Sequence, residues 1–69
     1  MRTGGNEMTT TDIKVVKLQV QMLCNHLRGA TTENQRLMLV SEVAAHLSRL
    51  SAAGVEFKGE YWKGEVEWV

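Results

Sequence analysis

Two stretches with the periodicity of amphipathic helices are separated in this chain by only three residues, Gly29, Ala30 and Thr31. A connection this short turns the second helix back alongside the first, so the pair forms an antiparallel hairpin. Folding about Ala30 would bring Leu23 close to Leu37. The sequence therefore predicts a mainly α fold that is built on a two-helix hairpin.

The first helix is predicted to run from about Thr11 to Arg28. Threonines at its start can accept hydrogen bonds from free amide groups, Asp12 suits the positive end of the helix dipole, and Gly29 is a typical stop. One apolar stripe follows the helical period: Ile13, Val16, Val20, Leu23, Cys24 and Leu27. Residues 16–22 also alternate between apolar and polar, which is typical of a strand, but the longer helical match favours the helix.

The second helix is predicted from about residue 32 to residue 53, and it ends before Gly54. Thr32 and Gln35 have the spacing of a capping box at its start. Its apolar residues share one broad side: Leu37, Leu39, Val40, Val43, Ala44, Leu47 and Leu50. This side is predicted to pack against the apolar stripe of the first helix.

The C-terminal tail, residues 55–69, differs in character from the helices. It contains two glycines and all four aromatic residues of the chain: Phe57, Tyr61, Trp62 and Trp68. This composition favours extended, β-like structure, with a short hairpin that turns between Gly59 and Gly64. The fold class is therefore a helical hairpin followed by an extended aromatic tail.

The N-terminal residues 1–9 contain glycine, threonine and asparagine without apolar periodicity, so they are predicted to be a flexible leader. Residues 10–69 are then one small domain. The codons for residues 4–7 are drawn from purine-rich families and can include a ribosome-binding site, which makes Met8 an alternative to Met1 as the native start. The intact mass of the natively expressed protein distinguishes the two.

A second apolar strip on the first helix consists of Val15, Leu18 and Met22, and it lies almost opposite the core stripe. A chain of 69 residues buries only about 60% of its unfolded surface and needs reinforcement. One hairpin partner can cover only one of the two apolar faces. The strip must therefore be covered by the tail, by a second copy or by another protein, and we favour a homodimer with four packed helices.

The aromatic tail residues have two readings. Small proteins use aromatic side chains to complete a core, and this reading is favoured, but tryptophan and tyrosine are also enriched at interaction hot spots. If the tail is a binding surface, Lys58 and Lys63 form its rim. The predicted protein-binding or dimer surface comprises Val15, Leu18, Met22, Phe57, Tyr61, Trp62 and Trp68.

The sequence contains no catalytic pattern: no phosphate-binding glycine loop, nucleophile elbow or facing carboxylate pair. We therefore expect no enzymatic activity and no cofactor. Cys24 and His26 would point about 200° apart on a helix, so they cannot hold one metal ion, and Cys24 is expected to be an inert core thiol. His46 has Glu42 one turn earlier, which predicts a surface pair.

The charge balance disfavours nucleic acid as a partner. Eight basic residues match eight acidic ones, so the chain lacks the cationic field that supplies most affinity for phosphate backbones. A DNA-associated regulator that uses Lys14, Lys17 and Arg28 on one helix face is the alternative. The sequence has no apolar run long enough for a membrane span and no signal peptide, so we expect a cytoplasmic protein in a bacterial cell.

The segment Met8-Thr9-Thr10-Thr11-Asp12, the cap–helix–glycine–helix plan and the short length resemble the small early-region accessory proteins of temperate enteric, lambdoid-type phages. The resemblance implies stoichiometric binding to a host or phage protein. The predicted function is therefore a regulator or inhibitor that works as a homodimer. The alternatives are the DNA-associated regulator and a structural subunit of a larger assembly.

Overall fold

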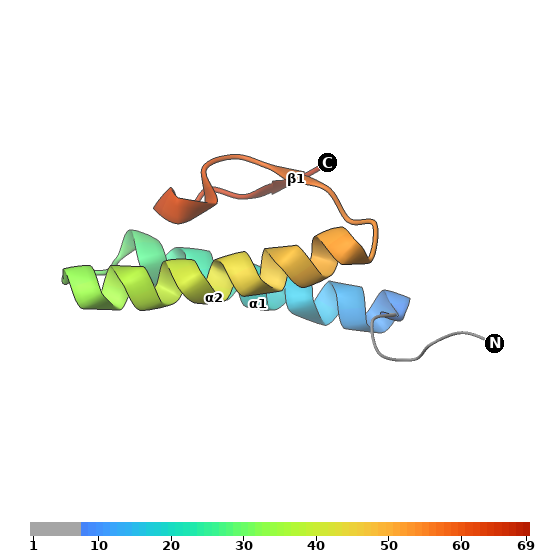
Figure 1. Ribbon diagram of the computed structural model, residues 1–69, viewed down its shortest axis with the longest axis horizontal. Coiled ribbons are helices and arrows are strands. Elements are labelled where there is room, and N and C mark those ends of the chain that lie inside the picture. The colour runs from blue at the N-terminus through green and yellow to red at the C-terminus, as the bar shows by residue number, and fades with distance from the viewer. Residues whose placement is uncertain (1–7) are drawn as a thin grey trace.

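The computed structural model describes residues 8–69 and consists of two long helices with a folded tail across one side of the pair (Figure 1). Its elements are α1 (Thr10–Arg28), α2 (Glu33–Ala52), β1 (Phe57–Lys58), the 3-10 helix η1 (Tyr61–Lys63) and β2 (Glu67–Trp68). The predicted mainly α fold, the antiparallel hairpin and the extended tail are confirmed. The strand alternative for residues 16–22 is wrong, because these residues lie in the middle of α1.

A complete capping box starts α1. The Thr9 hydroxyl accepts a hydrogen bond from the Asp12 amide at 3.0 Å, and the Asp12 carboxylate accepts one from the Thr9 amide at 3.3 Å. Met8 packs against the core. The last two residues of the predicted leader therefore take part in the fold, whereas the rest of that leader, including Met1, lies outside the described residues.

The start of α2 uses the predicted residues in a shifted arrangement. The Thr32 hydroxyl accepts a hydrogen bond from the Gln35 amide at 3.2 Å, as a capping box requires. The Gln35 side chain accepts its bond from the Thr31 amide at 3.4 Å and not from the amide of Thr32. Two free amide groups at the helix start are still satisfied.

The core lies between the helices and under the tail. Its buried residues come from one stripe of each helix: Val16, Val20, Cys24 and Leu27 from α1, with Val43, Leu47 and Leu50 from α2. The α1 stripe agrees with the prediction. On α2 the buried residues all lie in the second half of the helix, and the burial of this core is the main source of the hairpin's stability.

Leu37 is not part of this core, and its predicted place there is wrong. It is 58% exposed, and Leu23 lies beside Glu42 and His46 in a groove between the helices. The α2 residues that line this groove with Leu23 lie five and nine positions beyond Leu37, so they differ from the partner that folding about Ala30 predicts. Leu37 is left between this contact and the hairpin loop.

The tail forms the predicted hairpin. β1 and β2 pair antiparallel, with Phe57 opposite Trp68 and Lys58 opposite Glu67, and residues 59–66 with η1 make the connection. The Lys58 ammonium and the Glu67 carboxylate lie 3.7 Å apart on the exposed side of this pair. Figure 1 shows the hairpin running back over the two helices toward the end where they are joined.

Gly64 lets the tail backbone lie directly on α1. It is buried with φ +80°, and a Cβ atom there would lie 2.8 Å from both the Arg28 Cγ and the Cys24 carbonyl oxygen. Only glycine combines this backbone conformation with such close approach. The Arg28 guanidinium donates a hydrogen bond to the Gly64 carbonyl, so the contact ties the tail to the end of α1.

Candidate functional site

The back of α1 carries an exposed apolar strip of Val15, Leu18 and Met22. Their side chains are 48%, 63% and 60% exposed, so no segment within residues 8–69 covers them. The tail meets α1 on a different side, at Lys17, Cys24 and Arg28. The strip is predicted to be covered by the tail, by a second copy or by another protein, and in this structure the tail does not cover it.

The strip continues with the spacing of a coiled-coil seam. Positions 11, 15, 18, 22 and 25 alternate between steps of four and three, and α1 is a continuous helix through all of them. The middle three positions are the apolar strip, and polar Thr11 and Asn25 lie at its two ends. Exposed Lys14 and Gln21 flank one side of the seam, and exposed Gln19 and His26 flank the other. This arrangement suits packing against another helix, because an apolar row lies between polar flanks.

The predicted aromatic residues of the tail point mainly toward the core. Phe57, Tyr61 and Trp68 pack against the buried cluster, whereas Trp62 is 48% exposed. Phe57 and Tyr61 meet edge to face with ring centroids 6.3 Å apart, and Tyr61 meets Trp62 in the same way at 5.2 Å. The tail thus contributes aromatic packing to the core. Of the predicted surface residues, the structure brings one strip residue, Leu18, and one tail aromatic, Trp68, to a common groove.

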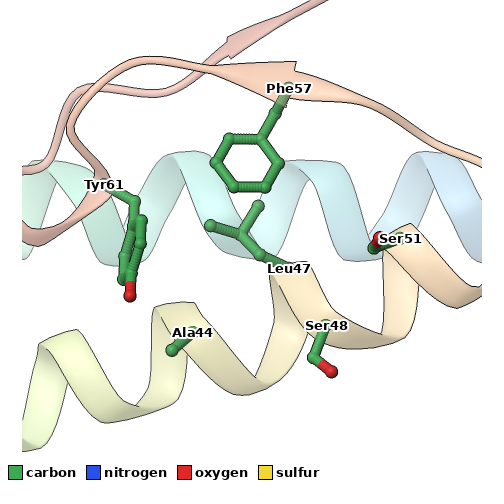
Figure 2. A pocket seen from close by; sticks show the side chains of 6 residues that line it. All are labelled: Ala44, Leu47, Ser48, Ser51, Phe57 and Tyr61. Carbon is green, nitrogen blue, oxygen red and sulfur yellow. The ribbon is translucent and has the colours of Figure 1, made fainter.

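A shallow cleft lies between the tail and α2. It has a volume of about 220 Å³, and its lining residues are Ala44, Leu47, Ser48, Ser51, Phe57 and Tyr61. Figure 2 shows the rings of Phe57 and Tyr61 pointing from the tail toward α2, with the Leu47 side chain below the Phe57 ring. The lining has no charged group, so the cleft can accept an apolar side chain but offers no acid–base chemistry.

A larger groove lies between α1 and β2. It has a volume of about 540 Å³, and its lining residues are Lys14, Lys17, Leu18, Gln21 and Trp68. The Lys17 ammonium lies 5.3 Å from the centroid of the Trp68 ring, which is within the range of a cation–π contact. Sequence reasoning missed this groove, because nothing local predicts that Trp68 docks beside Lys17.

A third groove lies between the helices on the side away from the tail. It has a volume of about 260 Å³ and is lined by Gln19, Met22, Leu23, Glu42 and His46. The His46 Nδ1 lies 2.8 Å from the Glu42 backbone oxygen, so this histidine bonds to the backbone and not to the Glu42 carboxylate. The interaction is a local helix contact.

Cys24 and the histidines form no reactive group in the described structure. Cys24 is buried in the core, and burial raises the pKa of its thiol while the charge of Arg28 lowers that pKa by a smaller amount. A raised pKa disfavours the thiolate, which is the nucleophilic form. Within residues 8–69, no three His, Cys, Asp or Glu side chains lie close enough together to hold a metal ion.

No helix in the described part of the chain is both long and apolar enough to cross a membrane. Among the three grooves described above, the α1–β2 groove alone has both cationic and aromatic lining. No protein-family model matches this sequence, and neither the curated proteins nor the solved structures contain a significant match.

Proposed function

We propose that this chain is a small protein-interaction module that forms a homodimer and acts as a stoichiometric regulator or inhibitor of another protein. The supporting observation is the exposed strip of Val15, Leu18 and Met22 on a helix whose opposite face already forms the core. Full burial of a side chain of this kind stabilises an interface by about 1.5–3 kcal/mol. Burial of the strip against another protein surface is therefore energetically favourable.

The strip is compatible with a two-fold symmetric helix pair. If α1 packs antiparallel against α1 of a second copy, Val15 faces Leu18 of that copy and Met22 faces its Thr11. On the flank of this pair, Lys14 lies opposite Gln21 and not opposite another cation. The pairing buries every residue of the strip without opposing like charges, which supports a dimer of hairpins with four helices.

The DNA-associated alternative receives less support from the side-chain contacts. It requires the three cations of α1, but the Arg28 guanidinium is hydrogen-bonded to Gly64 and Asn25. Lys17 is held over the Trp68 ring. Phosphate binding at Arg28 would have to compete with its hydrogen bonds to Gly64 and Asn25, so this cation gives the nucleic-acid alternative less support.

A permanent subunit of a larger assembly is the remaining alternative, and it differs from a regulator only in the lifetime of the complex. The resemblance to phage accessory proteins supports the regulator, with a host or phage protein as the target. Co-purification at a fixed stoichiometry through extended washing would favour the permanent subunit. Exchange with free protein would favour the regulator.

Sedimentation equilibrium tests the dimer with a matched pair of substitutions. We expect the wild-type chain to dimerise at high micromolar concentration and Met22→Gln to raise the dissociation constant about 100-fold, since each dimer loses two buried methionines. Met38→Gln is the control, because Met38 is 65% exposed on α2, away from the strip. A wild-type chain that stays monomeric at these concentrations contradicts the proposal, and equal weakening by both substitutions would move the interface elsewhere.

A further inference from the structure

The groove between α1 and β2 combines two lysines with an apolar floor. Lys14 and Lys17 lie one turn apart on one flank of α1. Leu18, a member of the exposed strip, provides aliphatic surface beside them, and Trp68 lines the groove from the tail. Gln21 also lines the groove, and its side chain can both donate and accept hydrogen bonds. The groove therefore presents positive charge around an apolar site.

We propose that this groove binds an acidic segment of the partner protein, in which carboxylate side chains flank a bulky aliphatic or aromatic residue. This inference rests on the proposed function as a protein-binding regulator and specifies the chemistry of its partner. Carboxylates of the segment pair with Lys14 and Lys17, and the apolar side chain packs on Leu18 and the Trp68 edge.

The charges around the groove select an acidic occupant. The described residues that line it include two ammonium groups and no carboxylate. The nearest acidic residue in the sequence to Trp68 is Glu67, and its carboxylate lies 3.7 Å from the Lys58 ammonium. Asp12, the acidic residue in the first turn of α1, is hydrogen-bonded to the Thr9 amide in the capping box. Neither carboxylate therefore substitutes for a partner's acidic group in the groove.

The contact between Lys17 and Trp68 prepares the groove for a carboxylate. The ring holds the Lys17 ammonium 5.3 Å from its centroid, which restricts a side chain that would otherwise be highly mobile in water. An ammonium over a ring still has free N–H donors. Binding of a carboxylate there costs less side-chain entropy than binding to an unrestrained lysine.

The same contact disfavours single-stranded nucleic acid. Proteins that bind single strands stack bases on exposed aromatic faces, with cations along the backbone. Lys17 lies over the Trp68 ring, so a base must displace it in order to stack there. A peptide carboxylate can pair with Lys17 without moving it from the Trp68 ring. The apolar residue beside that carboxylate then contacts Leu18 and the edge of the ring.

Selection from a random library of short peptides against the full chain tests this chemistry. We expect the enriched peptides to carry Asp or Glu on both sides of a Leu, Phe or Trp. Their dissociation constants, measured by fluorescence anisotropy, should rise about tenfold or more in the double variant Lys14→Gln, Lys17→Gln. They should also rise from about 0.02 M to about 0.5 M salt, because exposed charges are screened.

The control variant is the double substitution Arg36→Gln, Arg49→Gln, which removes the same charge from exposed positions of α2. It should leave the dissociation constants within about twofold. Enrichment of peptides without excess acid, no enrichment at all, or equal loss in both variants would overturn the proposal. So would tighter binding of a thymidine oligonucleotide at the same lysines, which would assign the groove to nucleic acid.

The dimer and the groove can fail separately. Leu18 belongs to both surfaces, so the test varies Lys14 and Lys17 for the groove and Met22 for the dimer. Met22→Gln is expected to weaken dimerisation about 100-fold. It should not weaken acidic-peptide binding, because Met22 does not line this groove. Peptide binding that persists without a dimer supports the groove alone. If the chain dimerises but binds no acidic peptide, the proposed peptide site is rejected and the proposed homodimer is retained.

Discussion

The Arg28 guanidinium at the end of α1 donates a hydrogen bond to the backbone carbonyl of Gly64, 36 residues later in the chain. The same guanidinium donates to the Asn25 side chain, which fixes its position one turn back on α1. This contact joins the tail to α1 where Gly64 lies against the Cys24 carbonyl. The stability of the tail therefore depends on Gly64 more than on any surface ion pair.

Substitution of Gly64 by alanine should lower the free energy of unfolding by about 2–4 kcal/mol, because the new Cβ both disfavours φ +80° and overlaps Arg28 and the Cys24 carbonyl. Gly54→Ala is the control, since Gly54 has φ +89° but nothing within 4 Å of a Cβ. It should cost only about 1–2 kcal/mol. Urea unfolding measures the free energy of unfolding of both variants. Equal losses would show that the backbone at Gly64 does not lie in close contact with α1.

Leu50→Ala should cost about 2–5 kcal/mol, because Leu50 is fully buried and its truncation leaves a cavity. Leu37→Ala should change stability by less than about 1 kcal/mol, because Leu37 is mostly exposed. Thermal denaturation followed by circular dichroism compares the two. A Leu37→Ala loss as large as that of Leu50→Ala would favour the hairpin register in which Leu23 faces Leu37.

Thr9→Ala should destabilise the chain by about 1 kcal/mol, because it removes the hydroxyl that caps the Asp12 amide. Thr11→Ala should have no such cost, since Thr11 is exposed inside the helix, where alanine is the better helix former. Both values come from urea midpoints. If Thr11→Ala is the more harmful change, the capping assignment is wrong.

The stability of the chain should contain a pH-dependent contribution from Cys24. Its pKa is raised in the folded state by burial, so the folded chain holds the thiol proton at a pH where the unfolded chain has released it. Stability therefore falls as the pH rises through the range in which the thiol of the unfolded chain ionises. Urea midpoints at neutral and alkaline pH should show a larger decrease for wild type than for Cys24→Ala. Equal decreases in the two proteins would mean that burial does not raise the pKa of the Cys24 thiol.

Local patterns in the sequence determined the two helices, their ends and their pairing. Apolar spacing identified the α1 stripe, Thr32 and Gln35 marked the start of α2, and the short connection required an antiparallel pair. These features depend on neighbours within one or two turns, so a single sequence is enough to predict them. The exposed strip on the back of α1 was predictable for the same reason.

The tertiary structure alone decided where the tail lies and what it covers. The groove exists because Trp68 docks beside Lys17 and Gly64 lies against Arg28, contacts between residues far apart in the sequence. No local pattern encodes such pairs, since they depend on how side chains pack after the hairpin has formed. The exposure of Leu37 has the same origin, because the register between two helices follows from the packing of all their contacts and not from the length of the loop.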